Sequence, residues 1–433
     1  MTRHGAQNTL FSVGKQRPLS CPRRRVVRSF LFGRSQQPCD NNDEEGNALL
    51  ELMSRAGVDF GPLKSGLFSS GMGRGLYATT LILPGQRICS IDISHMITVD
   101  SAVEYLAKVM PGAENLRSHD PWAVLALFLC MMSSERYNES TYMIQYRRVL
   151  PTFVDTVLEW DQDDVNLLRG SHLHTIAEQI REFAHDTVAD VMNANAPDID
   201  EESIRWSLSI LLSRLVRLET AAGESILVLC PGLDFLNMSC DSTSFISLDR
   251  DQHVYMKSDR LYKPGDQVCI SYGEKTSGEL YLSYGFYPDE NPHDACLFSI
   301  HADSVTLIQE MQELNIPEHN VFPLRLEGLP EGLLRYAAII SLSEDNVDLL
   351  PSLHALRADK DLPLHHMKRS LGWLSKMIRE TLSRFNMPLN ECKHILEQTK
   401  ENDRKHIIAH MMLQEQRILN KSMFIIDSMR RQM

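Results

Sequence analysis

Two groups of residues, far apart along the chain, have the types and spacing that a ligand site needs. The first is the glycine-rich stretch from Gly71 to Thr79, and the second comprises Asp234 to Ser239, Ile270 to Gly273 and Tyr284 to Phe286. Glycines let the backbone approach a bound molecule closely. Tyrosines give a channel an apolar wall that also carries a hydroxyl. Each piece alone is a weak signal, since isolated glycine turns and strand tyrosines are usually structural.

The elements that must position these residues alternate between strands and helices. Short apolar runs with turn signals predict strands from Leu67 to Ile93, and strand patterns return between Ser225 and Ser271. Helical spacing fills the stretch between them and resumes in the last third of the chain. We therefore expect an α+β protein with these parts: a basic tail and linker over residues 1–46, a β-rich domain over 47–300 with a helical insert at about 101–221, and an α-helical domain over 301–433.

The bulk composition is that of a globular protein. Of 433 residues, 43% are apolar and 23% are charged, which suffices for two domains with sizeable cores. No apolar run approaches the roughly 18 residues that a membrane-spanning helix needs, so we expect a soluble protein without a membrane partner. The nine cysteines are scattered without a CxxC pair. This pattern predicts a reducing compartment and no zinc site.

Charge is spread unevenly along the chain. Residues 1–39 carry eight Lys or Arg and no acidic residue, although the whole chain has a net charge of −13. The tail is compatible with a nuclear-import signal, an organelle transit peptide, a nucleic-acid contact or a disordered segment without an address. The acidic remainder favours basic protein partners, such as histone tails, over direct nucleic-acid binding.

Taken together and in this order, the two groups resemble the SET-domain protein methyltransferases. The similarity is greatest to the subgroup typified by the Rubisco large-subunit methyltransferase, and within it to the SET domain-containing protein 4 branch. It extends from about Arg23 to the C-terminus and includes Val149 to Pro151 with Trp160, Ser213-Arg214, and Leu413 to Leu419. The resemblance implies a SET-type β fold of small sheets interrupted by a helical insert, followed by an α-helical substrate-binding domain.

The resemblance also implies an activity. It is the S-adenosylmethionine-dependent transfer of a methyl group to a lysine of a histone or a nonhistone protein. The target amine must be neutral although its ordinary pKa is about 10.4, and an apolar aromatic channel favours the neutral form. Methylation of histidine remains an alternative, as does a noncatalytic SET-like module that binds a protein partner. We expect a monomer in the nucleus or cytosol, with organelle targeting by the tail left open.

Carried over by position, the resemblance assigns a role to each motif residue. Tyr272 is the catalytic tyrosine, and it lines the substrate channel together with Tyr284. Arg214 would pair with the carboxylate of the methyl donor, a contact that suits a guanidinium. The full set of expected donor-binding residues is Met72, Gly73, Arg74, Gly75, Leu76, Arg214, Asn237, Met238, Tyr272 and Phe286.

The chain departs from the family pattern at two places. Relatives usually have His where this chain has Met238, and they often have Asn in the stretch that contains Ser277-Gly278. Met238 removes the hydrogen bonds of an imidazole, which keeps the noncatalytic alternative open. His406 and His410 share a helix face as metal ligands do, but no carboxylate lies between them, so no metal site is expected.

Overall fold

The computed structural model describes most of the chain. The described residues are 38, 40, 43–68, 73–110, 113–132, 142–193, 199–288, 290–342, 353, 362–401 and 403–433. Residues 1–37, which hold the charges of the basic tail, lie outside them, as do Gly71 and Met72. The chain forms two compact units, of which the first comprises Met1–Glu159, Ile180–Lys275 and Tyr281–Phe286 and the second comprises Trp160–Gln179, Thr276–Leu280 and Tyr287–Met433. The domain limits expected from the sequence remain predictions.

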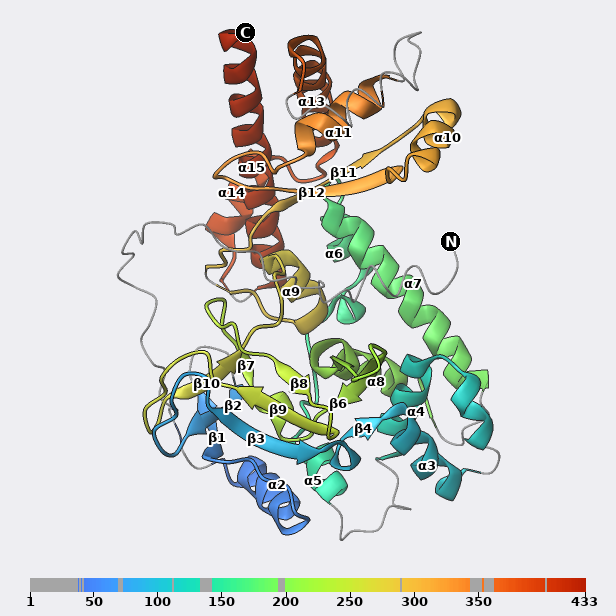
Figure 1. Ribbon diagram of the computed structural model, residues 1–433, viewed down its shortest axis with the longest axis vertical. Helices are drawn as coiled ribbons and strands as arrows, with labels where there is room; N and C mark the ends of the chain where they lie inside the picture. The colour runs from blue at the N-terminus through green and yellow to red at the C-terminus, as the bar shows by residue number, and fades with distance from the viewer. Residues whose placement is uncertain are drawn as a thin grey trace. The chain divides into compact units, whose positions relative to one another are not determined.

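Small sheets form the centre of the first unit (Figure 1). One sheet has the strand order β1 (Leu63–Phe68), β2 (Gly73–Ala78), β10 (Gln267–Ile270) and β7 (Asn237–Met238). The second is β3 (Arg87–Asp92), β9 (His253–Lys257) and β8 (Ile246–Leu248), and the third is β4 (Ile97–Thr98), β6 (Ser225–Leu229) and β5 (Val216–Glu219). This arrangement confirms the predicted α+β class with small sheets.

The first sheet joins the two motif groups of the sequence. Strand β2 carries the glycine-rich stretch and pairs antiparallel with β10, with Val268 opposite Leu76. Strand β10 pairs parallel with β7, with Ile270 opposite Met238. A parallel pair requires a crossover connection, and here residues 239–266 supply it through β8 and β9. Segments almost 200 residues apart therefore lie side by side.

Helices pack beside these sheets in the same unit. They are α2 (Glu44–Arg55), α3 (Val99–Val109), α4 (Pro121–Met131), α5 (Tyr142–Val149), the later part of α7 (His172–Asn193) and α8 (Glu201–Arg214). Helix α4 is buried along nearly its whole length because it packs against both α3 and α8. The helical insert ends at Arg214 rather than near residue 221, because Val216 and Leu218 alternate with polar residues and form β5.

The second unit is mainly helical. It contains α6 (Gln162–Asn166), the start of α9 (Ser277–Tyr284), α10 (Val305–Glu313), α11 (Leu333–Ser341), α13 (Leu364–Arg384), α14 (Leu389–Gln398) and α15 (Arg404–Gln432). Helix α13 packs against α11 and α15. The sequence reading missed one feature here, the antiparallel pair β11 (Cys296–His301) and β12 (His319–Leu324). No helix in the described ranges is long and apolar enough to cross a membrane.

Candidate active site

The glycine-rich strand and strand β7 meet at a contact that only glycine permits. The side-chain amide of Asn237 donates a hydrogen bond of 3.1 Å to the carbonyl of Arg74. A Cβ atom at Gly75 would lie 2.7 Å from that same amide nitrogen and 2.8 Å from Nε2 of Gln267. Gly75 is therefore required so that Asn237 can reach the neighbouring backbone.

Gly73 is the exposed residue of the glycine-rich strand, while Gly75 and Leu76 are buried. Gly73 has φ +64, and among the described residues that are not its chain neighbours no atom lies within 4 Å of the place where its Cβ would stand. Leu76 is fully buried in the core. Because Gly73 is exposed and has no side chain, a bound molecule can approach the main chain there.

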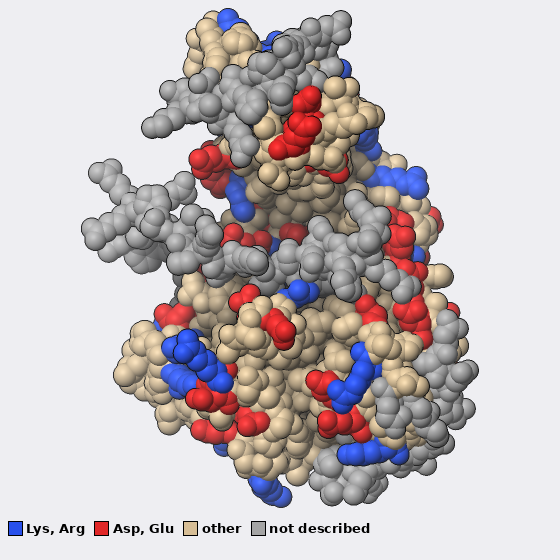
Figure 2. Space-filling view, turned by 45° about the vertical axis from the view of Figure 1, so that its right-hand side comes forward, with Lys and Arg blue, Asp and Glu red and all other residues tan. Residues whose placement is uncertain are grey.

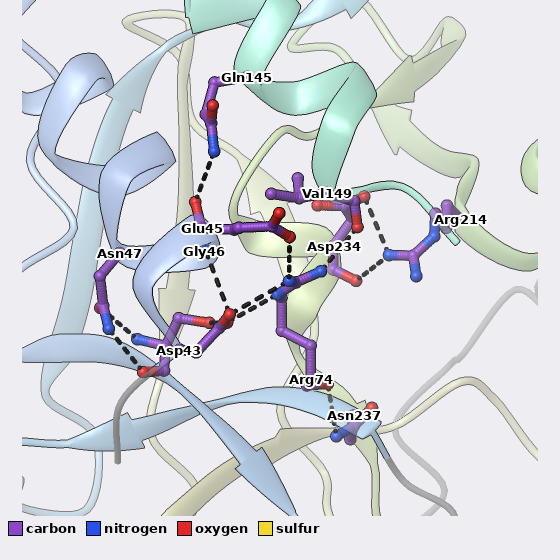
Figure 3. Close-up of polar contacts among 11 residues, drawn as sticks. Asp43, Glu45, Gly46, Asn47, Arg74, Gln145, Val149, Arg214, Asp234 and Asn237 are labelled. Carbon is purple, nitrogen blue, oxygen red and sulfur yellow. Dashed lines mark hydrogen bonds and ion pairs between the residues drawn. The ribbon is translucent and has the colours of Figure 1, made fainter. Parts of the chain in front are cut away.

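The side chain of Arg74 points toward Asp43 and Val149 and away from Asn237 (Figure 3). Its Nε and Nη2 atoms donate to the two carboxylate oxygens of Asp43 at 2.6 and 3.1 Å. Its Nη1 atom donates to the carbonyl of Val149 at 2.7 Å. Burial works to raise the pKa of Asp43, but hydrogen bonds from Arg74 and Ser65 outweigh it and hold that pKa below its ordinary value.

A second buried ion pair stands beside the candidate catalytic residues. Nη1 of Arg214 donates to Oδ2 of Asp234 at 3.1 Å and to its carbonyl at 2.9 Å. The hydroxyl of Tyr146 donates to the same Oδ2 at 2.9 Å. Burial raises the pKa of Asp234, while the guanidinium acts in the opposite direction. Nε of Arg214 is buried and has no partner in the described part of the chain.

Two aromatic side chains pack against Tyr272. Its ring stacks on Tyr284 with the centroids 4.9 Å apart, and Phe286 stands edge-on to both rings at 6.3 and 6.2 Å. The hydroxyl of Tyr272 donates to the carbonyl of Leu236 at 2.9 Å. Burial raises the pKa of Tyr272, with Tyr284 adding to the effect, and burial raises the pKa of Tyr284 to about 12. Both hydroxyls are therefore neutral near pH 7.

Backbone pairing fixes the segment that contains Met238. Met238 lies in β7 opposite Ile270, and the next amide, that of Ser239, donates to the carbonyl of Ile270 at 3.0 Å. The hydroxyl of Ser242 donates to the carbonyl of Cys269 at 3.2 Å. These contacts anchor the segment without an imidazole at position 238.

The second departure from the family pattern, at Ser277-Gly278, and the paired His406 and His410 have structural explanations within the second unit. A Cβ at Gly278 would lie 2.4 Å from Leu173, so close packing requires glycine there. His410 shares a hydrogen bond of 3.0 Å with the hydroxyl of Tyr287, and His406 shares one of 3.1 Å with Thr399. Among the residues that the structure describes, no group of three metal-binding side chains occurs.

The structure thus brings together most of the residues that the sequence singled out. Gly73 to Leu76, Arg214, Asn237, Met238, Tyr272, Tyr284 and Phe286 all lie in the first unit, while Met72 is outside the described residues. Sequence reasoning missed Asp43 and Tyr146. Asp43 belongs to an acidic run that is typical of a linker, and Tyr146 follows no recognisable spacing, so neither position carried a signal.

Two family matches cover most of the described chain. Residues 73–273 match the SET domain, and residues 308–419 match the Rubisco LSMT substrate-binding domain. The chain belongs to the SET-domain methyltransferases of the Rubisco LSMT-like subgroup. SET methyltransferases use S-adenosylmethionine as their methyl donor.

Curated relatives of this SET-domain protein include enzymes that act on different amino acids. It is 25% identical over 377 residues to the [fructose-bisphosphate aldolase]-lysine N-methyltransferase of Arabidopsis thaliana, covering 78% of this chain and 74% of that protein. It is 24% identical to the actin-histidine N-methyltransferase of Danio rerio, covering 70% and 53%. Human SET domain-containing protein 4 is 26% identical over 53% of this chain and 55% of its own length.

The solved structures support the fold of this SET-domain protein. The SET domain of LSMT bound to lysine and AdoHcy matches with a TM-score of 0.71 and 19% identity, covering 90% of this chain and 92% of that one. At this level of identity the similarity establishes the fold alone.

Proposed function

We propose that this protein is an S-adenosylmethionine-dependent protein-lysine N-methyltransferase. The observation that supports the proposal is that β10 lies between β2 and β7, while the Asn237 side chain in β7 hydrogen-bonds to the glycine-rich strand and Tyr272 stacks on Tyr284. A site for methyl transfer must hold a donor and a nucleophile in line in a channel poor in water. We propose that the backbone of Gly73 and the side chain of Asn237 bind the donor, and that the rings of Tyr272 and Tyr284 form the wall of the channel for the nucleophile.

The residues present fit the methyl donor. Gly73 is exposed, and Arg214 retains a buried Nε donor that suits a carboxylate. Asn237 has a side-chain oxygen that suits an ammonium group, and Phe286 offers an apolar surface. When bound, S-adenosylmethionine supplies an activated methyl group. The proposed donor-binding residues are Met72, Gly73, Arg74, Gly75 and Leu76 through their backbone, with Arg214, Asn237, Met238, Tyr272 and Phe286.

The protein's own groups would act by positioning and by excluding water. Tyr272 and Tyr284 form an aromatic wall that disfavours a charged ammonium, so it lowers the cost of a neutral lysine amine. The hydroxyl of Tyr272 is neutral and is held by the carbonyl of Leu236. Preorganised dipoles of this kind contribute to catalysis because they need no rearrangement during the reaction.

The substrate is proposed to be a histone or a nonhistone protein. On the face drawn in Figure 2, Lys and Arg side chains alternate with Asp and Glu and form no continuous basic surface among the coloured residues. This favours a protein substrate over direct nucleic-acid binding. We propose that a monomer acts in the nucleus or cytosol. An organelle is an alternative address, since three relatives are named as chloroplastic.

Two other functions have specific support. Actin-histidine N-methyltransferases among the relatives favour histidine as a possible target, and the channel residues are compatible with an imidazole. Met238, in place of the usual histidine, favours a noncatalytic module that binds a protein partner.

The test is transfer of radiolabelled methyl from S-adenosylmethionine to core histones and to a cell extract. We expect labelling by the natural chain and its loss in Tyr272→Phe, with amino-acid analysis separating methyllysine from methylhistidine. Calorimetric binding of the donor without any labelling would contradict an enzyme and favour the binding module. Activity that arises only in Met238→His would support that second function.

A further inference from the structure

An exposed phenylalanine stands in an otherwise anchored loop. Residues 150–156 connect α5 to the short 3₁₀ turn Val157–Glu159. Both ends of this loop are buried, with Leu150 3% and Thr156 0% exposed, yet the side chain of Phe153 is 60% exposed. Burying an aromatic ring is favourable, and the fold leaves most of the Phe153 ring in contact with solvent.

The loop is fixed although it has no regular secondary structure. The indole of Trp206 donates to the carbonyl of Pro151 at 3.0 Å. The hydroxyl of Tyr281 donates to Oδ2 of Asp155 at 2.9 Å. Because these bonds hold the loop on both sides of Phe153, a partner that contacts the ring would lose little entropy in ordering it.

The loop also touches the segment that carries the aromatic cluster. Gly285, between Tyr284 and Phe286, has φ +74, and a Cβ there would lie 2.9 Å from the backbone nitrogen of Asp155. Phe153 is two residues from this contact. It therefore stands on the piece of chain that is packed directly against the proposed substrate channel.

We propose that Phe153 determines substrate specificity by packing against an apolar or aromatic side chain that flanks the target residue of a protein substrate. The inference rests on the proposed methyltransferase function. Aromatic residues are enriched at the energetically dominant positions of protein interfaces, particularly where they are held rigidly. A flanking side chain of the substrate is the occupant that this position fits, because the target residue itself enters the neighbouring channel.

Single exposed apolar residues are common on protein surfaces, so the test needs a matched control. Leu83 supplies it, because it is 53% exposed in the same unit and lies beside the turn at Pro84 rather than on the channel loop. The probe is a degenerate peptide library with a fixed central lysine and one flanking position varied at a time. Nα-acetyl-lysine amide, which has no flanking residues, is the second substrate.

We expect the natural chain to prefer peptides with an apolar or aromatic residue at one flanking position. Phe153→Ala should lower kcat/KM about tenfold for those peptides, much more than for the lysine amide, and should flatten the preference. Phe153→Tyr should retain the preference, and Leu83→Ala should leave it as in the natural chain.

The outcomes separate the inference from the proposed function. A natural chain that methylates neither peptides nor the lysine amide overturns the proposed lysine methyltransferase and this inference with it. A natural chain that methylates peptides with a profile that Phe153→Ala does not change overturns the role of Phe153 alone. Equal losses for peptides and for the lysine amide would also overturn it, since they indicate a general effect on the channel.

Discussion

The hydroxyl of Tyr146 donates a hydrogen bond of 2.9 Å to the buried carboxylate of Asp234, 88 residues further along the chain. The same carboxylate oxygen accepts a bond from Arg214. Asp234 lies in the 3₁₀ turn Leu233–Phe235. The carbonyl of Leu236, directly after this turn, accepts a hydrogen bond from the hydroxyl of Tyr272. A residue of the helical insert is thereby linked to the candidate catalytic tyrosine through one buried turn.

Removing that hydroxyl tests whether the link matters for ligand binding. We expect Tyr146→Phe to weaken S-adenosylmethionine binding about tenfold, because Asp234 loses a buried donor and then competes more strongly for Arg214. Calorimetry measures the affinity, and thermal unfolding measures stability. The matched control is Tyr336→Phe, which removes a 2.8 Å bond to the carbonyl of Pro317 in the other unit. Equal affinities in the natural chain and Tyr146→Phe would refute the link.

The Arg74–Asp43 pair should contribute mainly to stability. We expect Arg74→Lys to lower the free energy of unfolding by about 2 kcal/mol, because lysine cannot make the two-pronged contact with Asp43 and also reach Val149. Arg117→Lys is the control, since its ion pair with Asp100 is exposed and should change stability little. Denaturant titration measures both, and similar small effects would show that the buried pair is not needed.

The glycine between the two channel aromatics should be sensitive to a single methyl group. Gly285→Ala adds backbone strain at φ +74 and a close contact with Asp155, so we expect lower stability and a loss of methyl transfer. Gly85→Ala is the control, because its φ is +79 and, apart from its chain neighbours, no atom in the described part of the chain lies within 4 Å of its Cβ position. Gly85→Ala therefore adds a similar backbone strain but no close contact like that between position 285 and Asp155. If both variants retain equal activity, the close approach at Gly285 does not shape the channel.

Glu415 should make stability depend on pH. Burial raises its pKa from 4.5 to about 7, with a hydrogen bond from Ser171 acting against burial and the charge of Asp294 adding to it. Tyr287 and Cys296 also face the carboxyl. Because the folded state binds this proton more tightly than the unfolded state, its contribution is fully present below about pH 4.5 and is lost as pH rises through 7.

The variant Glu415→Gln isolates this effect. We expect its Tm to exceed that of the natural chain by a difference that grows between about pH 4.5 and 7 and is constant above that window. The corresponding difference in the free energy of unfolding has an upper limit on the order of 3 kcal/mol. Thermal scans across pH 4 to 8 measure it, and Glu397→Gln on the exposed side of α14 is the control. A gap that does not vary with pH would mean that Glu415 does not titrate in this range.

The sequence by itself determined the fold class and the composition of the candidate site. Glycines, tyrosines and an asparagine in a fixed order indicated two halves of one site, because these residue types are rarely interchangeable where backbones approach or aromatic walls form. Helical periodicity placed the insert between the halves and predicted a helical last third. It could not reveal the strand pair β11 and β12, because a short strand has too few residues to outweigh helical neighbours.

The tertiary structure alone decided what the charged and buried polar side chains do. Arg74 lies within the glycine-rich stretch, yet its guanidinium faces Asp43 and Val149, and Arg214 is already paired with Asp234. Tyr146 had no signal in the sequence at all. The physical reason is that a long polar side chain takes its partner from whatever the fold brings near it, and here those partners lie 20 to 88 residues away.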